Sequence, residues 1–147
     1  SGAMNIEIMV DCDDNVYVME LGPRNGGNLV PQLVEYATGI NMVALTIDAA
    51  IGNLHKKSMP EQNEIKGYYS YYVIHSSKDG KFNDVSISSH IEENILEKHI
   101  FKVKGDKIYA FDGSHCSIGL LLLKFDTNEI MNDIVNNMDD YVKVSFL

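Results

Sequence analysis

Two short stretches of this sequence decide its fold: NIEIMV at residues 5–10 and VYVMELGPRNGG at residues 16–27. In both, apolar side chains alternate with others, which is typical of β-strands, and residues 13–15 favour a turn between them. A turn centred on Asp13 and Asp14 places Glu7 opposite Glu20. The same register gathers apolar side chains on the other face: Ile6, Ile8, Val10, Tyr17, Met19 and Leu21. We therefore predict a hairpin whose apolar face covers a core.

The residues after this hairpin predict a loop followed by two helices. Glycine, proline and asparagine dominate residues 22–27, which is loop composition. Asn28 is expected to be the N-cap of the first helix, and Pro31 falls in its first turn, where its missing N–H costs nothing. Gly39 ends this helix, and a second apolar helical pattern covers residues 41–51.

The second half of the chain is richer in strand patterns. Residues 53–66 are polar and form the expected linker, which leaves 67–147 as a β-rich subdomain. Strands are expected at 68–75, 82–87, 100–103, 107–111, 117–125 and 141–146, with a short helix at 91–96. Turns at 78–80 and 105–106 join the first four strands into two hairpins. Asp126 and Glu129 indicate a capping box that starts a late helix. The fold class is therefore α/β, and α+β within this chain.

Composition excludes several classes of protein. The 147 residues carry 12 basic and 21 acidic side chains, a net charge of −9, so a general nucleic-acid binder is not expected. No apolar run approaches the roughly 20 residues of a membrane helix, so no membrane association is expected. Cys12 and Cys116 form no disulfide framework, which favours a reducing cytoplasm. Residues 1–4 resemble the remnant of an expression tag.

The first hairpin and its loop carry the strongest chemical signal. Opposed residues on one face of a hairpin have Cβ atoms about 5 Å apart, and like charges there are destabilising unless a cation lies between them. Glu7 and Glu20 would supply two converging carboxylates. Such a pair is what proteins usually contribute to a Mg²⁺–nucleotide site. Arg24 adds a planar bidentate donor, and a helix start at Asn28 favours an anion. The alternative is two solvated surface carboxylates beside an ordinary loop.

The same stretches resemble the end of the ATP-grasp fold of carboxylate–amine ligases. The resemblance rests on Asn5-Ile6-Glu7-Ile8, on residues 16–27, and on Tyr36-Ala37-Thr38-Gly39-Ile40. It implies that Glu7 and Glu20 hold the Mg²⁺ ions that bridge the ATP phosphates. It also implies that Arg24 binds the carboxylate substrate or its acyl-phosphate. The usual signature is Glu-x-Asn, but Gly22 stands at the Asn position, so Asn25 and Asn28 are the candidates to replace that ligand.

The resemblance has consequences for the whole protein. It implies that residues 5–52 form the C-terminal part of an ATP- and Mg²⁺-binding core, within a fragment of a ligase similar to carbamoyl phosphate synthetase or biotin carboxylase. The parent would use ATP and a small carboxylate or bicarbonate, and the fragment alone would be inactive. The apolar hairpin face predicts a homo-oligomer. The alternative function is a non-catalytic binding or interaction module in which the hairpin carboxylates are structural.

Other candidate residues fit simpler interpretations. His115 and Cys116 are neighbours whose side chains point apart in a strand, so a turn is the favoured interpretation. His75, His90 and His99 have no metal-ligand spacing and are expected to be solvated or hydrogen-bonded. The tyrosines between 68 and 72 are explained by a half-buried strand.

Overall fold

The structure is a computed structural model that describes residues 2–53, 61 and 63–147. It divides into two compact units, Ser1–Ile65 and Lys66–Leu147, which are considered one at a time. Most of the expected linker at 53–66 lies outside the described residues. No helix in the described part of the chain is long and apolar enough to cross a membrane.

The first unit begins with an antiparallel hairpin, β1 (Asn5–Val10) and β2 (Val16–Gly22). The loop between them is organised by Asp11, whose Oδ1 accepts the backbone N–H groups of Asp13 and Asn15, each at 2.9 Å. Side-chain and backbone hydrogen bonds from Asn15 lower the pKa of the Asp11 carboxyl. The carboxylate therefore stabilises a five-residue loop at residues 11–15.

This wider loop corrects the predicted register. Glu7 lies opposite Glu20, as predicted, but the register then shifts so that Ile8 pairs with Val18 and Met19 is passed over. The prediction that Tyr17 and Met19 belong to the apolar face is wrong, because a bulge at this point moves the tip of β2 by one residue. The register instead groups Ile6, Ile8, Val10, Val16, Val18 and Leu21.

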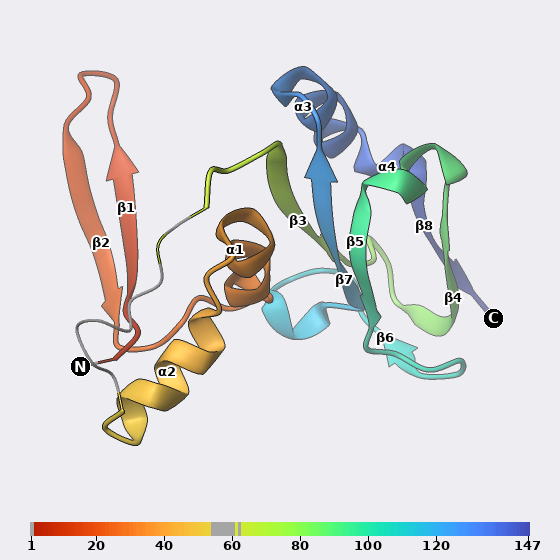
Figure 1. Cartoon of the computed structure of the whole chain (residues 1–147). Helices are drawn as coiled ribbons and strands as arrows, with labels where there is room; N and C mark the ends of the chain where they lie inside the picture. Colours follow the sequence, from red (N-terminus) through yellow and green to blue (C-terminus); the bar gives the residue numbers. More distant parts are fainter. Residues whose placement is uncertain (1, 54–60, 62) are drawn as a thin grey trace. The chain divides into compact units, whose positions relative to one another are not determined.

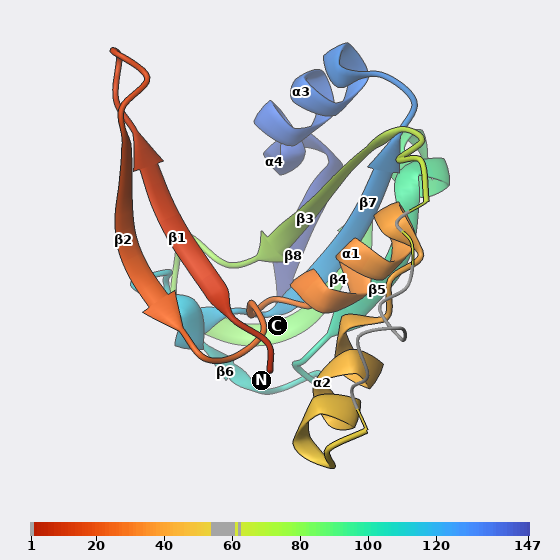
Figure 2. The ribbon, with the colours of Figure 1, turned by 60° about the vertical axis from the view of Figure 1, so that its left-hand side comes forward.

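Two helices follow the hairpin, and in both views it extends away from them as a separate ribbon (Figures 1 and 2). Helix α1 (Val30–Thr38) has Pro31 in its first turn and ends at Gly39, where φ is 74°. The prediction that Asn28 is its N-cap is wrong: Leu29 holds that position without a side-chain cap. Asn28 and Leu29 both have positive φ, so the chain enters the helix through a left-handed turn.

Helix α2 (Met42–Ala50) confirms the second helical pattern. Its N-cap is Asn41, whose side-chain oxygen accepts the backbone N–H of Ala44 at 2.7 Å. An Asn41 amide N–H also donates to Glu35 of α1 at 3.0 Å, so the turn between the helices is tied to both of them.

The second unit contains six strands in two antiparallel sheets, β3-β7-β5 and β6-β4-β8 (Figure 1). The strands are β3 (Tyr68–Ile74), β4 (Gly80–Ile87), β5 (Ile95–Ile100), β6 (Lys107–Ile108), β7 (Gly119–Phe125) and β8 (Val142–Phe146). Both predicted hairpins are wrong, because β3 pairs with β7 and β4 pairs with β6 and β8. The turn residues at 78–80 and 105–106 are present, but they carry the chain between sheets. Burial of β7 at the centre of its sheet outweighs pairing between neighbours in sequence.

Short helices connect these strands and pack against strands of both sheets. They are η2 (Ser89–Asn94), η3 (Ser114–Cys116), α3 (Asn128–Asn136) and α4 (Met138–Tyr141), of which η2 and η3 are 3₁₀-helices. The N-cap of α3 is Thr127 rather than the predicted Asp126, because the Thr127 hydroxyl accepts the Ile130 N–H at 3.3 Å. Ile134 of α3 joins the core around β7, which includes Leu121, Leu123 and Phe125.

Candidate functional site

The two carboxylates predicted to bind metal come from opposite strands of the first hairpin. Glu7 on β1 and Glu20 on β2 are register partners, immediately before the shift that displaces the hairpin tip. Both are exposed, and within the described residues neither has an ion-pair partner closer than 4.0 Å. The structure therefore brings two like charges together with no cationic side chain to offset them, which is unfavourable unless something else supplies positive charge.

The loop after β2 brings Arg24 to the same glycine as Glu20, without an ion pair between the two side chains. The Arg24 N–H donates to the Gly22 carbonyl at 2.8 Å, and its Nη1 donates to the Asn25 carbonyl at 2.9 Å. A Cβ added at Gly22 would lie 3.8 Å from Arg24 Cγ and 3.9 Å from Glu20 Oε1. Glu20 and Arg24 therefore flank the same glycine, and both distances are ordinary van der Waals contacts. The first atom of an asparagine side chain would fit there, so local crowding does not explain Gly22.

Asn25 is turned toward α2, where its amide nitrogen donates to Thr46 Oγ1 at 2.9 Å. Thr46 in turn donates to the Met42 carbonyl at 2.7 Å, so the loop is fixed to the helix. A cavity of about 830 Å³ opens at this junction. It is lined by Gly2, Ala3, Met4, Pro23, Arg24, Asn25, Thr46, Ala49 and Ala50.

Asn28, the other predicted ligand, lies apart from this cavity lining. It is exposed and has a φ of 52°, at the left-handed turn before α1. The structure thus brings Arg24 and Asn25 to one cavity and places Glu7 opposite Glu20. Gly22 lies between Glu20 and Arg24 in the chain and close to both side chains.

The donor chemistry fits a hard divalent cation. Two carboxylates supply oxygen ligands, which Mg²⁺ prefers, and they leave other coordination positions open for water and phosphate oxygens. Arg24 supplies the planar donor that suits a carboxylate or a phosphate. Neither the two carboxylates nor Arg24 and Asn25 offer the sulfur or imidazole ligands that would favour a softer metal.

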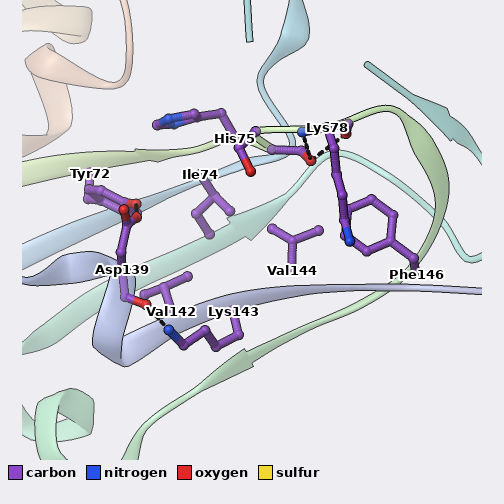
Figure 3. Close-up of a pocket in the computed structure, with 11 residues that line it drawn as sticks. Tyr72, Ile74, His75, Lys78, Asp139, Val142, Lys143, Val144 and Phe146 are labelled. Carbon is purple, nitrogen blue, oxygen red and sulfur yellow. Dashed lines mark hydrogen bonds between the residues drawn. The ribbon is translucent and has the colours of Figure 1, made fainter. Parts of the chain in front are cut away.

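A second cavity, in the other unit, was not predicted from the sequence (Figure 3). It has a volume of about 350 Å³ and lies between β3 and β8, with Lys78, Lys143 and Asp139 among its lining residues. The Tyr72 hydroxyl donates to Asp139 Oδ1 at 3.3 Å, and burial, followed by the charge of Asp139, raises the pKa of Tyr72 to about 12. Lys78 Nζ lies 4.6 Å from the centre of the Phe146 ring.

The histidines without ligand spacing have ordinary partners. His75 packs against Phe111 with ring centres 4.8 Å apart, and His90 stacks on Tyr141 at 5.4 Å. His99 Nε2 lies 2.6 Å from Glu97 Oε2.

Comparison with solved structures identifies the fold. The whole chain superposes on an L-amino acid ligase from Bacillus licheniformis with a TM-score of 0.85 and 21% identity, covering 99% of this chain and 36% of that one. The TM-score is 0.78 for phosphoribosylglycinamide synthetase from Anaerococcus prevotii, with 23% identity, 99% of this chain and 37% of that one. This chain has the fold of part of an ATP-grasp ligase.

Other ATP-grasp structures match in the same way. The biotin carboxylase domain dimer of Hydrogenobacter thermophilus 2-oxoglutarate carboxylase, in complex with MgADP, ADP and bicarbonate, has a TM-score of 0.70 and 18% identity over 98% of this chain and 32% of that chain. No protein-family model and no curated sequence matches this chain. The chain spans about a third of the length of these ATP-grasp relatives.

The predicted resemblance to the ATP-grasp superfamily is thus confirmed at the level of the fold. The resemblance rests on residues within 5–52, yet the superposition covers 99% of this chain and so includes the second unit. The antiparallel pairing in both units agrees with the α+β description of this part of the ATP-grasp fold.

Proposed function

We propose that this chain is the C-terminal part of an ATP-dependent ligase that activates a carboxylate or bicarbonate as an acyl-phosphate, which an amine or another nucleophile then attacks. The observation that supports this proposal most strongly is the opposed pair Glu7 and Glu20, followed by Arg24, on an ATP-grasp fold. An exposed pair of like charges has no stabilising role in the hairpin itself, whereas it suits a metal–nucleotide site.

Each of these residues has a distinct role in the proposed reaction. Glu7 and Glu20 would hold Mg²⁺, which, when bound, neutralises phosphate charge. Arg24, turned back over its own loop by the bond to Asn25, would hold the carboxylate or the transferring group in a bidentate contact. Asn25 keeps this loop on α2 through Thr46, so it fixes the position from which Arg24 acts.

The remaining contacts to ATP would come from the other two thirds of an ATP-grasp enzyme. Relatives of this chain are recorded with MgADP and bicarbonate, which supports ATP, Mg²⁺ and a small carboxylate or bicarbonate as the ligands of the parent protein. The isolated chain is expected to have no ATPase or ligase activity, and a cytoplasmic setting would supply the ATP. ATP turnover by the isolated chain above a Glu20→Ala control would contradict the proposal that the rest of the parent protein supplies the remaining ATP contacts.

The test uses the longer protein that contains this chain. ADP release is measured with ATP, Mg²⁺ and a panel of carboxylates and amines, in the wild type and in Glu20→Gln. The variant should lose at least about 100-fold in turnover, because charge stabilisation of a transferring phosphoryl group is worth several kcal/mol. Glu93→Gln, at another exposed carboxylate in the second unit, is the matched control and should keep full activity. Equal activity of Glu20→Gln and wild type would instead indicate a structural or binding role for the hairpin.

A further inference from the structure

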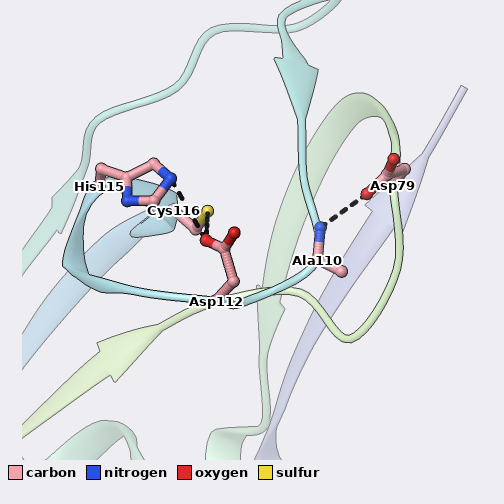
Figure 4. A network of polar contacts seen from close by, with 5 residues as sticks. All are labelled: Asp79, Ala110, Asp112, His115 and Cys116. Atoms are coloured by element: carbon pink, nitrogen blue, oxygen red, sulfur yellow. Dashed lines mark hydrogen bonds and ion pairs between the residues drawn. The ribbon is translucent and has the colours of Figure 1, made fainter.

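Three side chains of types that can ligate a metal meet on the loop between β6 and β7, far along the chain from the hairpin carboxylates (Figure 4). Asp112 Oδ1 lies 3.2 Å from His115 Nε2 and 3.2 Å from Cys116 Sγ. One ligand atom from each of the three residues lies within 4.8 Å of the other two. The sequence analysis considered His115 and Cys116 as a pair and did not include Asp112, which is what joins them.

Backbone hydrogen bonds to the last residue of β3 and to the segment just after it fix both ends of this loop. The Phe111 N–H donates to the Ser76 carbonyl at 2.8 Å, and the Ile118 N–H donates to the Ile74 carbonyl at 2.7 Å. The loop therefore begins and ends beside β3, an edge strand of the sheet β3-β7-β5. Its ends are positioned by the core, so the three side chains do not depend on a free loop to meet.

The turn inside the loop brings the residues to one side. The Cys116 N–H donates to the Gly113 carbonyl at 3.0 Å, which closes a single 3₁₀ turn. This spacing places His115 and Cys116 three and four residues after Asp112, so that both side chains reach its carboxylate. The predicted turn at this point is confirmed, and the turn is what allows neighbouring residues to share a partner.

We propose that Asp112, His115 and Cys116 form a binding site for a zinc-like divalent transition metal, with a fourth coordination position open to solvent. In a tetrahedral zinc site, bonds of about 2.0–2.3 Å separate the ligand atoms by about 3.3–3.6 Å. The two 3.2 Å distances to Asp112 Oδ1 are close to this spacing. All three ligand atoms lie within 4.8 Å of one another, so metal binding would draw the His115 and Cys116 side chains together around one ion.

The environment suits a metal that binds from solvent. Cys116 is buried, with 6% of its surface exposed, whereas the side chains of Asp112 and His115 are each 75% exposed. The sulfur thus forms the floor of the site and the other two ligands form its open side. A thiolate with an imidazole selects zinc, cobalt or nickel over magnesium, so this site differs in chemistry from the hairpin carboxylates.

Metal binding at this site must displace a proton. Without metal, the Cys116 thiol donates to Asp112 Oδ1; on binding, the S–H bond breaks, a sulfur–metal bond forms and the proton passes to solvent. Affinity should therefore increase with pH, because each metal ion that binds releases a proton.

The experiment is titration of the full chain with Zn²⁺ by calorimetry and with Co²⁺ by absorption spectroscopy. One equivalent should bind, and Co²⁺ should give the charge-transfer band of a cobalt–thiolate bond. Cys116→Ser should abolish this band and weaken Zn²⁺ binding by at least about 100-fold, since even residues that only support a metal ligand can cost that much. Cys12→Ser removes the other, exposed cysteine and is the matched control, which should bind as wild type does.

Two further variants keep the test decisive if Cys116→Ser folds poorly. Asp112→Asn and His115→Gln change exposed side chains, so circular dichroism should show a native fold while Zn²⁺ binding weakens by at least about tenfold. Binding that is lost in Cys12→Ser, or that is unchanged in Asp112→Asn and His115→Gln, would overturn the proposal. So would the absence of a thiolate band in folded wild-type protein. In those cases the three residues form only a hydrogen-bonded turn.

Discussion

The strands of the two units are similarly apolar but are buried very differently. In β7, Leu121, Leu122 and Leu123 are each 0% exposed, because strands flank β7 on both sides and α3 contributes to the same core. In β1 and β2, Ile8 is 53% and Val18 61% exposed, although these residues share one face. Every buried hydrophobic residue in the described part of the chain lies at or after Ile74. Apolar alternation thus identifies a strand, but burial depends on what packs against it.

The largest effect expected from this difference is self-association through the hairpin. Exposed apolar patches of this kind drive association, and a dimer at micromolar concentration corresponds to about 8 kcal/mol. Light scattering of the isolated chain should therefore give a dimer or a larger closed oligomer at tens of micromolar. Val18→Asp should shift it to monomer, whereas Ser77→Asp, with the same charge change in the second unit, should not. A strictly monomeric wild type at high concentration would contradict the prediction.

Truncation of one leucine in each unit tests the difference in burial directly. Leu121→Ala, in the core around β7, should lower the free energy of unfolding by about 2–5 kcal/mol. Leu21→Ala, in β2 at 60% exposure, should change it by no more than about 0.5 kcal/mol. Urea unfolding followed by circular dichroism measures both. Equal losses would show that the hairpin is packed as tightly as β7.

The phenol of Tyr72 reports on the sheet that contains β7. Its pKa is raised to about 12 by burial and then by Asp139, so the folded state favours the protonated form. The resulting stability is fully present below pH 10, the usual pKa of the unfolded group, and is lost as the pH rises toward 12. Because solvent screens this half-buried group, wild type should lose less than the full shift implies, about 0.5 kcal/mol more than Tyr72→Phe, between pH 9 and pH 11.

A difference titration of phenolate absorbance between wild type and Tyr72→Phe measures this pKa without the other tyrosines. An ordinary pKa of 10 for Tyr72 would mean that the phenol is solvated and that the hydrogen bond to Asp139 is not made.

The smallest effect concerns the opposed carboxylates in the hairpin. In metal-free buffer, Glu20→Gln removes repulsion from Glu7 and should stabilise the isolated chain by about 0.2–0.5 kcal/mol. Glu93→Gln, on the exposed surface of the second unit, serves as the control and should leave stability unchanged. A clear loss of stability in Glu20→Gln would assign the carboxylate a structural role, in agreement with a non-catalytic module.

The metal candidates show how far residue patterns can predict a site. Glu7 and Glu20 lie on two strands that are joined by a local turn, so their pairing could be predicted from the sequence. The cluster of Asp112, His115 and Cys116 is even closer in sequence, but it requires a 3₁₀ turn held by Ile74 and Ser76 of a distant segment. The Tyr72–Asp139 contact joins residues 67 positions apart, and no local pattern indicates it.

The sequence by itself determined the features that depend on nearby residues. These include the first hairpin, the end of α1 at Gly39, the helical pattern of α2 and the strand pattern of β7. Each is set within a few residues by turn chemistry, backbone conformation or hydrophobic period.

Only the tertiary structure decided which strands pair, where the hairpin register shifts and how α1 begins. Gly80 could follow β3 into a hairpin, but β3 pairs with β7, whose Leu121, Leu122 and Leu123 are 0% exposed, and β4 pairs with β6 and β8 instead. A longer connection adds little entropic cost to such pairing, because loop-closure entropy grows only slowly with length. Non-local burial therefore overrides the nearest partner in sequence, and the functional groups that meet through it become visible only in the fold.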